Sequence, residues 1–535
     1  MPTENFDQGT CQGNRDVCQE SRAICRDHEV CGGCVYQGVP YEEQLANKFG
    51  EVRALLEKKG FSEEILLPIE PAPCRYSYRN KMEYTFGDLQ KDGPTTLGMH
   101  KKGHFMSIIT VDECQLVHED FNTILRAVLA FVQERGYTHY HKKKHTGLMR
   151  HLIIRRGIRT GELLINICTS SEGETPADGP AASGGAKVFG KSAGANGAKA
   201  FDKSVDADNV EAFDEAAFVD MILALPLENR VVGILRTIND RLADAVYCDE
   251  LRILHGRDYY NEEIMGLKFK VSAFSFFQTN VDAVERLYSY AVGLIDDFEN
   301  KKVFDLYCGT GTITQVLARK ASEVVGIEIV EEAVEVAKTA ARDNGLDNCR
   351  FIAGDCFKVL ASIDDKPEVI VVDPPRVGMS TDAMDKIISY GVNQIVYISC
   401  NPKTLVENLY YMQYYGYEIV SVKPFDNFPG TKHCETVCLL SHQSRKFAQI
   451  KVDTEELVDD NSLASPTYKN IKAWILKTYG VKMHTAYIAQ VKRKYGLPMR
   501  ECCHKSKNEN YVPQQVSEEQ EKMIVDALKY FKAIK

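Results

Sequence analysis

Apolar and polar positions follow different periods in successive parts of the chain. Residues 39–60 carry apolar side chains at helical spacing and end at Gly60, which predicts a helix with a glycine C-cap. From about residue 71 to residue 275, apolar and polar residues alternate in short runs separated by turn residues, as half-buried strands do. The runs are YRNKMEYTFGD, TTLGMHKKGHFMSIITVDEC, LMRHLIIRRGIRTGELLINICTS and RVVGILRTIND. This part is expected to form a β-rich domain.

From about residue 276 the pattern changes to an alternation of strands and helices. The strand-like runs include KVFDLYC, EVVGIEI, PEVIVVD and NQIVYIS, and helical stretches such as EEAVEVAKTAARDNG separate them. This order predicts a doubly wound, Rossmann-like α/β sheet. Beyond the sheet, residues 465–496 predict two short helices; Ser465 and Pro466 begin the first, and Gly480 ends it.

These patterns divide the chain into four predicted parts. They are a cysteine segment with a helix (1–70), a central β-rich α+β domain (71–275), an α/β domain (276–445) and a basic helical C-terminal extension (446–535). Residues 171–210 interrupt the central domain with Gly, Ala, Ser and Asp and show no apolar period. We expect a disordered surface insertion there rather than a domain boundary.

The charge balance limits the classes of partner. The 535 residues carry a net charge of −10, so a nucleic-acid partner would need a local basic surface. Residues 466–505 offer one candidate, with nine Lys or Arg and one acidic residue, and HKKKH at 141–145 offers another. No run of about 20 apolar residues predicts a membrane span, and the polar N-terminus predicts no secretion signal. A cytoplasmic location is expected.

Cysteine is unusually frequent, with 17 residues in a chain that shows no export signal. Thiol, metal or catalytic use is therefore favoured over a disulfide framework. Cys25, Cys31 and Cys34 have the spacing of half a metal site. A CxxC pair alone could be redox-active or bind zinc, and a purely thiolate ligand set suits zinc or an iron–sulfur cluster. Cys11 and Cys18 lie outside this motif, and free thiols are the default there.

A cofactor site is indicated where the first strand of the α/β part ends. Asp305 is followed by a loop with Gly309 and Gly311 and then by a helix, and ligands bind beyond the carboxyl ends of such strands. The loop is neither GxGxxG nor GK[ST], so a dinucleotide and a P-loop phosphate are disfavoured. Glu328, 23 residues after Asp305, can accept hydrogen bonds from ribose hydroxyls. Together these residues favour S-adenosylmethionine; alternatively, Glu328 is only a charge at a helix N-terminus.

Two further strand ends carry candidate chemistry. Asp373-Pro374-Pro375 resembles the (D/N)PP(Y/F/W) motif of amino-group methyltransferases, in which an aromatic residue stacks on the base. Arg376 takes the aromatic position here, which disfavours methylation of an exocyclic amine. Cys400 lies between the apolar run NQIVYIS and an Asn-Pro turn, so it is either a small core residue or a thiolate at the lip of a cleft.

In combination, these motifs resemble the RNA uracil-C5 methyltransferases, most closely the branch that modifies 23S ribosomal RNA. The resemblance extends from about residue 25 to residue 441, without the insertion. It rests on seven motifs in one order: CRDHEVCGGC, YRNKMEYTF, SAFSFFQTN, DLYCGTGT, VVDPPRVG, YISCNP and HCETVCLL. The family implies a class I S-adenosylmethionine-dependent methyltransferase domain that follows a central RNA-binding domain.

The resemblance also implies roles for individual residues. Cys400 matches the nucleophile and Glu435 the proton acceptor. A thiolate that adds to C6 of uracil makes C5 able to attack the methyl group of the cofactor, and a base must then remove the C5 proton. The positions that match the cofactor contacts of the family are Gln278, Tyr307, Thr312, Glu328 and Asp373. Relatives often carry Asn where this chain has Thr312.

The reaction limits how the RNA can be presented. A uridine inside a duplex cannot reach such a site, so the target must be unpaired or flipped out. Phe274, Phe276 and Phe277 are candidates for stacking on RNA bases, although core packing is expected for one or two of them. The product would be 5-methyluridine in 23S ribosomal RNA.

A [4Fe–4S] cluster is the second cofactor that the family implies. Cys114 matches its fourth ligand, after Cys25, Cys31 and Cys34. Within the family this cluster separates the ribosomal-RNA branch from the transfer-RNA branch, which lacks it. Because methyl transfer needs no electron, we expect a structural or RNA-orienting role. No obligate protein partner is evident.

The chain departs from the family at both ends. Many relatives begin with a β-barrel RNA-binding module of roughly 60 residues; the 24 residues before Cys25 are too few for it, so its absence is expected. The basic extension could supply phosphate contacts instead, or present an ordinary solvated helical face.

Two alternative functions stay open, a transfer-RNA uracil-C5 methyltransferase and a non-catalytic Fe–S RNA-binding protein. The cysteine set argues against the first, and the presence of both Cys400 and Glu435 against the second.

Overall fold

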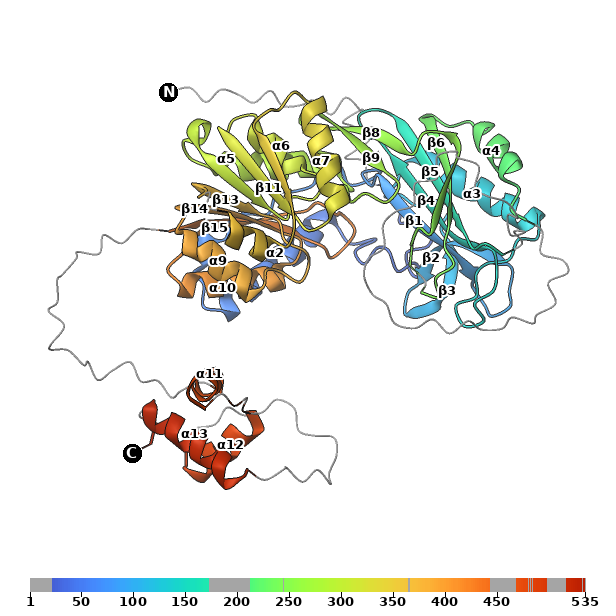
Figure 1. Ribbon diagram of the computed structural model, residues 1–535. Coiled ribbons are helices and arrows are strands. Elements are labelled where there is room, and N and C mark those ends of the chain that lie inside the picture. Colours follow the sequence, from blue (N-terminus) through green and yellow to red (C-terminus); the bar gives the residue numbers. More distant parts are fainter. Residues whose placement is uncertain are drawn as a thin grey trace, which may run out of the picture. The chain divides into compact units, whose positions relative to one another are not determined.

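The structure is a computed structural model (Figure 1) and falls into two compact units, Met1–Arg445 and Lys446–Lys535. It describes residues 22–172, 212–442 apart from 244, 364 and 365, 468–497 apart from 480, 482 and 484, and 516–534 apart from 532. The expected insertion at 171–210 lies almost wholly outside the described residues, as do Cys11 and Cys18. No helix in the described part of the chain has the length and apolar character needed to cross a membrane.

The central part of the first unit is a mixed sheet with the strand order β3-β2-β1-β4-β5-β6-β7. Of the neighbouring strands only β5 and β6 run parallel to each other. The predicted alternation is visible in β1, where Met82, Tyr84 and Phe86 are buried. The strands are β1 (Lys81–Asp88), β2 (Thr95–Lys101), β3 (His104–Thr110), β4 (Met149–Arg156), β5 (Glu162–Thr169), β6 (Arg230–Ile238) and β7 (Glu250–Gly256).

Two helices, α3 (Glu119–Glu134) and α4 (Glu215–Leu223), cover one face of this sheet (Figure 1). Phe121 and Val128 of α3 and Phe218 of α4 belong to the apolar cluster that the buried residues of β1, β4 and β5 form. The apolar stretch EAAFVDMIL after the insertion therefore forms a helix that packs on this sheet.

The second half of the first unit is a seven-stranded sheet with the order β12-β11-β10-β13-β14-β16-β15. The strands from β12 to β14 are parallel, and β16 is antiparallel to both of its neighbours. This arrangement confirms the predicted doubly wound, Rossmann-like α/β fold. The strands are β10 (Lys302–Leu306), β11 (Glu323–Glu328), β12 (Cys349–Ala353), β13 (Val369–Val372), β14 (Gln394–Ser399), β15 (Glu418–Phe425) and β16 (Glu435–Ser441).

Helices pack on both faces of this sheet (Figure 1). One apolar cluster joins α5 and α6 to the sheet through Val284, Leu287 and Ile313, and a second cluster joins α8, α9 and α10 to it. The helices are α5 (Val281–Gly293), α6 (Thr312–Ala318), α7 (Glu331–Asp343), α8 (Cys356–Ser362), α9 (Thr381–Tyr390) and α10 (Pro402–Tyr414), with short 3₁₀ turns at η1 (Glu63–Ile65) and η2 (Phe298–Asn300).

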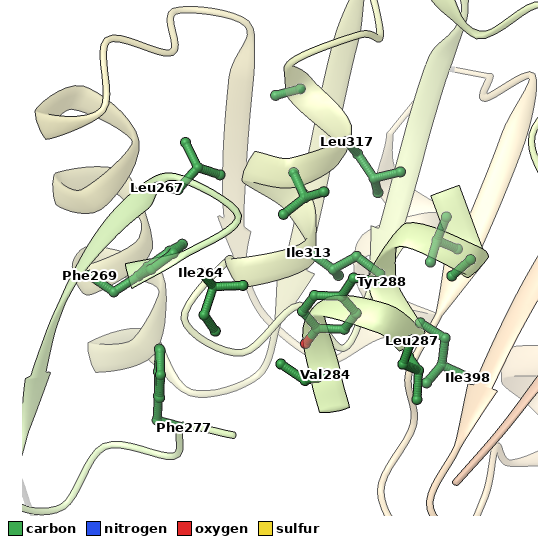
Figure 2. Close-up of a cluster of buried hydrophobic side chains, with 14 of the residues drawn as sticks. Ile264, Leu267, Phe269, Phe277, Val284, Leu287, Tyr288, Ile313, Leu317 and Ile398 are labelled. Carbon is green, nitrogen blue, oxygen red and sulfur yellow. The ribbon is translucent and has the colours of Figure 1, made fainter. Parts of the chain in front are cut away.

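A β-hairpin connects the apolar cores of the two sheets. Its strands are β8 (Tyr259–Ile264) and β9 (Leu267–Ser272). Figure 2 shows Leu267 and Phe269 of this hairpin in the same cluster as Tyr288 of α5. Leu164 and Leu235 of the central sheet belong to this cluster too. The hairpin therefore fixes the central sheet against the doubly wound domain.

The N-terminal helix α2 (Tyr41–Lys58) packs on the doubly wound domain. Val52 and Leu56 lie in one apolar cluster with Leu405 and Leu409 of α10. The helix therefore contributes to the core of a domain that begins more than two hundred residues later in the sequence.

The chain beyond α2 continues along the same domain. Gly60 follows the helix with a φ of 79°, a left-handed conformation that glycine adopts without strain, and this agrees with the predicted helix end. Leu66 then pairs with Val422, and Glu70 with Phe425, both in parallel. These pairs cover the outer edge of β15, which would otherwise present unpaired backbone groups.

The second unit has three helices in its described part, α11 (Tyr468–Tyr479), α12 (Thr485–Lys494) and α13 (Glu518–Tyr530). The first two match the two predicted helices, although Gly480, the predicted end of the first, is outside the described residues. The third helix was not predicted; it starts with a capping box of Ser517 and Gln520.

Candidate active site

The order of the parallel strands reverses between β10 and β13, and ligands bind at such switch points beyond the carboxyl ends of the strands. The loop after β10 has an unusual backbone, because Tyr307 has a φ of 67° and Gly309 one of 54°. The N–H group of Tyr307 donates to the carbonyl oxygen of Ile327 (2.9 Å). A Cβ atom on Gly309 would have no neighbour within 4 Å. The backbone at Gly309 is therefore open to an approaching ligand.

Gly311 has a packing role rather than a binding role. It precedes the first residue of α6, Thr312, and has a φ of 74°. A Cβ atom there would lie 2.7 Å from the ring of Phe351 and 2.9 Å from Cβ of Ala337. Glycine lets α6 pack tightly against α7 and β12, and Thr312 is buried at the start of the helix.

Two carboxylates flank this loop. Glu328 ends β11 and accepts hydrogen bonds from the N–H groups of Gly309 and Val330, both at 3.0 Å. Asp305 is buried and accepts from the Thr314 hydroxyl at Oδ2, whereas its Oδ1 has no partner among the described groups. Burial raises the pKa of Asp305 to about 8. A buried acceptor without a partner beside an open glycine backbone fits a ligand with a cationic or N–H donor group, such as the amino group of S-adenosylmethionine.

Asp373 and Gln278 complete the predicted cofactor set. Asp373 directly follows β13, and burial raises its pKa to about 7. The amide of Gln278 donates to the hydroxyl of Tyr288 at 3.4 Å. Burial and then the negative charge of Asp373 raise the pKa of Tyr288. The side chains of Gln278, Tyr288 and Asp373 therefore lie close together. The structure thus brings the predicted residues to one end of the sheet.

The central sheet and the motif YRNKMEYTF hold a neighbouring segment of the site through hydrogen bonds to that segment's backbone. The side chain of Asn80 donates to the carbonyl oxygen of Gln278 (3.0 Å), and its N–H group donates to that of Thr279 (3.0 Å). The Arg155 guanidinium donates to the carbonyl oxygen of Ser275 (2.7 Å). The central sheet therefore holds the segment SAFSFFQTN in place beside the cofactor loop.

The three phenylalanines of that segment have different environments. Phe277 is buried and its ring lies 5.9 Å from that of Phe269; Figure 2 shows the two together. Phe274 is half-buried against the same cluster. Phe276 is 75% exposed, so of the three it has a ring face free for a base.

Cys400 follows β14 and is half-buried. The next residue, Asn401, accepts a hydrogen bond from the N–H group of Lys403 (3.2 Å) and so caps α10. Its amide also donates to the carbonyl oxygen of Arg376 (2.9 Å), as does the hydroxyl of Thr404 (3.2 Å). The loop after β13 is therefore tied to the strand end that carries Cys400.

The antiparallel direction of β16 brings Glu435 next to Cys400. Ser399 of β14 pairs with Thr436 of β16, so the residue after Ser399 and the residue before Thr436 lie at the same edge of the sheet. Burial and then the charge of Glu435 raise the pKa of Cys400 to about 11. Burial and then the charge of Asp373 raise the pKa of Glu435 to about 8.

Arg376 is the cation of this site and was not predicted to have a role in it. Its guanidinium donates a hydrogen bond to Cys400 and so acts to lower the pKa of that thiol. Its charge also acts to lower the pKa of Glu435. Arg376 is exposed, so a bound substrate can contact it. The sequence signal was the Arg in place of an aromatic residue after Asp-Pro-Pro. It disfavoured methylation of an exocyclic amine but did not indicate what Arg376 does.

The four predicted cluster ligands lie near one another. Burial first, and then the negative charges of Cys114, Cys31 and Cys25, raise the pKa of Cys34 to about 12. Burial raises the pKa of Cys114 to about 11, while N–H groups of Leu116 and Val117 donate to its sulfur. No group of three or more His, Cys, Asp or Glu residues in the described ranges has an arrangement that could hold a metal ion. Four thiol donors are a set that suits zinc as well as an iron–sulfur cluster.

Comparisons with known proteins identify relatives of this chain. The family model described as tRNA (uracil-5-)-methyltransferase matches residues 247–443. An RNA methyltransferase of Clostridium tetani is 43% identical over 422 residues, which is 79% of this chain and 84% of that protein. An RNA methyltransferase of Caldanaerobacter subterraneus is 42% identical over 421 residues, 79% of this chain and 85% of that protein.

A solved structure has the same fold. It is the crystal structure of the tRNA (uracil-54, C5)-methyltransferase of Pyrococcus abyssi in complex with S-adenosyl-L-homocysteine. The match has a TM-score of 0.58 and 24% sequence identity, and covers 77% of this chain and 86% of that one. With this fold and these relatives, the chain belongs to the family of S-adenosylmethionine-dependent RNA uracil-C5 methyltransferases.

Proposed function

We propose that this protein methylates C5 of a uridine in 23S ribosomal RNA and that the product is 5-methyluridine. The reaction type rests on one observation: Cys400 and Glu435 lie next to each other, at the adjoining ends of β14 and β16. A thiol beside a carboxyl group, with Arg376 next to both, is what covalent activation of uracil followed by proton removal requires.

In this mechanism the Cys400 thiolate adds to C6 of the uracil ring and turns it into an enolate. Arg376 stabilises the thiolate before the attack. S-adenosylmethionine, when bound, supplies the methyl group that the activated C5 takes up. The Glu435 carboxylate then removes the C5 proton, the bond between C6 and sulfur breaks, and Cys400 leaves as the thiolate.

The cofactor would be held at the carboxyl ends of β10, β11 and β13. We assign its contacts to the Gly309 backbone and to the free oxygen of Asp305, together with the residues that match the family: Gln278, Tyr307, Thr312, Glu328 and Asp373. The exposed ring of Phe276 would stack on the flipped target base or a neighbour of it.

The choice of 23S ribosomal RNA rests on the cysteine set. We propose that Cys25, Cys31, Cys34 and Cys114 bind a [4Fe–4S] cluster, because the other three thiols lie close enough to Cys34 for their charges to raise its pKa, and all four are sulfur donors. The resemblance described above links such a cluster to the ribosomal-RNA branch. Its role would be to order the N-terminal segment, since methyl transfer needs no electron.

One experiment tests the substrate. The protein is purified without oxygen, its iron and sulfide are quantified, and it is incubated with methyl-labelled S-adenosylmethionine and either unmodified 23S ribosomal RNA or unmodified transfer RNA. We expect label in 5-methyluridine from the 23S sample only. Label in transfer RNA would keep the chemistry and overturn the proposed substrate. A protein that contains its cluster and labels neither RNA would contradict the proposed reaction.

The reaction should become faster as the pH rises from 6 to 8. Both working forms are deprotonated, and burial raises the pKa of Cys400 to about 11 and that of Glu435 to about 8. Below pH 8 both groups gain their active form with rising pH, so kcat/KM for RNA should rise by up to about tenfold per unit for each group. Above pH 8 only Cys400 continues to titrate, and the slope should fall. A kcat/KM that decreases between pH 6 and 8, measured at saturating cofactor, would contradict these assignments.

A further inference from the structure

The C-terminal unit has an apolar core of its own. Ile471 and Ile475 of α11 are fully buried, as are Ile488 of α12 and Ile524 and Leu528 of α13. Figure 1 shows the three helices gathered in one bundle. Because these inward residues use one side of each helix, the outward sides are available for a partner.

The outward side of α12 is positively charged. The helix has the sequence TAYIAQVKRK, with no acidic residue and with Lys492, Arg493 and Lys494 in its last turn. Lys492 is buried with its ammonium 5.4 Å from the Tyr468 ring centre. Arg493 is exposed, and Lys494 is exposed although it pairs with Glu521 of α13. In a chain with a net charge of −10, this cationic surface fits a polyanion such as the RNA backbone.

The same unit exposes an aromatic cluster. The ring centre of Trp474 lies 5.2 Å from that of Tyr530 and 5.9 Å from that of Tyr479. Tyr530 is 64% exposed, and the Tyr479 hydroxyl donates to Asp526 (2.8 Å), which fixes α11 against α13. Rigid, exposed aromatic rings stack well on unpaired bases, and exposed cations on another helix of the same bundle supply phosphate contacts.

We propose that the bundle of α11, α12 and α13 in the C-terminal unit is a second RNA-binding site of this enzyme. Arg493 and Lys494 contact phosphates of a single-stranded segment, and Tyr530 with Trp474 stacks on its bases. The proposal rests on the proposed function only in taking RNA as the partner. Since the unit is covalently joined to the methyltransferase, an RNA molecule bound to one unit binds to the other as an intramolecular event, which raises the overall affinity. Its loss should therefore raise the KM for long RNA and leave kcat unchanged.

The single tryptophan of the chain provides a direct signal, because Trp474 belongs to this cluster. The full-length protein is titrated with a short single-stranded RNA of adenosine and cytidine, which has no uridine to react. We expect the fluorescence of Trp474 to change on binding. Tyr530→Ser should weaken this binding by about 5- to 150-fold, the range for one lost base stack. Tyr414→Ser, which removes an exposed tyrosine of α10, is the matched control and should have no effect.

Salt dependence tests the cationic helix. The double variant Arg493→Ser/Lys494→Ser should reduce the slope of log affinity against log salt by about 1.4, which is about 0.7 for each lost phosphate contact. Lys522→Ser/Lys529→Ser removes two exposed charges from α13 instead and should leave the slope unchanged. The proposal would be overturned if the fluorescence of Trp474 did not change on addition of RNA. It would also be overturned if the two double variants changed the salt slope equally.

The proposed function and this inference can fail separately. Cys400→Ala should lose methyl transfer and keep the fluorescence response. Loss of the response in Tyr530→Ser, with unchanged kcat on 23S ribosomal RNA and a raised KM, would support the second site. Unchanged KM in both α12 and Tyr530 variants would contradict it.

Discussion

Methyl transfer to RNA is expected to disappear when Cys400 is replaced with alanine. The single-turnover rate should fall by about 10⁴-fold or more, as in other enzymes that lose a covalent nucleophile. The physical reason is that C5 of uracil attacks an electrophile only after a thiolate has added to C6. The structure fits this role, because Cys400 is half-buried at a strand end with Arg376 donating to its sulfur. Incorporation of labelled methyl groups into RNA measures the effect.

Two further variants separate this role from a general loss of a thiol. Cys248→Ala removes a half-buried cysteine of the central domain and should leave the rate unchanged. Glu435→Gln keeps the nucleophile and lacks the proton acceptor, so RNA should stay attached to the protein and form a complex that resists denaturation. No such complex should form with Cys400→Ala. Methyl transfer by Cys400→Ala near the normal rate would move the nucleophile to another residue.

The doubly wound sheet could be predicted because its strands are buried on both faces. VIVV of β13 and QIVYIS of β14 are almost continuous apolar runs, which is what parallel strands covered by helices require. Asp373 and Cys400 directly follow such runs, and Asp305 lies one residue before the end of β10. Parallel strands carry their carboxyl ends to the same edge. The sequence pattern was therefore enough to gather these three residues at one site.

The position of Glu435 was not available from periodicity. An apolar strand looks the same whether it runs parallel or antiparallel, and only the pairing of Thr436 with Ser399 brings Glu435 beside Cys400. The resemblance to the family supplied that residue instead. Arg376 was missed for a similar reason, since its backbone is held by Asn401 and Thr404 at the start of α10. Contacts between distant loops leave no local pattern.

The packing of the N-terminal part was also beyond the sequence pattern. The period of α2 predicts a helix with an apolar side, but its partners Leu405 and Leu409 lie some 350 residues further along. In α3 the apolar positions have a helical period too. This helix was not predicted, because the strand-like runs on both sides of it dominate the pattern. Amphipathic periods indicate that a face is buried and do not name the surface that buries it.

The loop between β15 and β16, residues 426–434, is held by this N-terminal part. The carbonyl oxygen of Gly430 accepts hydrogen bonds from the N–H groups of Val35 and Tyr36, at 3.1 and 3.0 Å. The N–H group of Gly430 donates to the side chain of Gln44 (3.0 Å). Because Glu435 follows shortly after this loop, the segment next to the proposed cluster ligands bears on the position of the proposed proton acceptor.

Replacing Lys48 with methionine is expected to lower the free energy of unfolding by about 3–5 kcal/mol. Lys48 and Asp426 have no exposed side-chain surface, and Nζ lies 2.5 Å from Oδ1. The ammonium also donates to the carbonyl oxygen of Phe428 (3.1 Å). Without Lys48, the hydroxyl of Tyr41 (2.9 Å) is the one side-chain donor that the buried charge of Asp426 keeps among the described residues. Thermal and urea denaturation of the purified protein measure the loss.

Lys59→Met is the matched control, because Lys59 forms an ion pair with the exposed Glu407, and such pairs contribute about 0–1 kcal/mol. Lys48→Met/Asp426→Leu removes both buried charges and should recover most of the stability. Equal losses for Lys48→Met and Lys59→Met would contradict a stabilising buried pair.

At a temperature where Lys48→Met stays folded, a displaced loop should also slow the proton removal by Glu435, so turnover should fall and the covalent RNA complex should accumulate. Normal turnover in a destabilised Lys48→Met protein would show that the pair acts on stability alone.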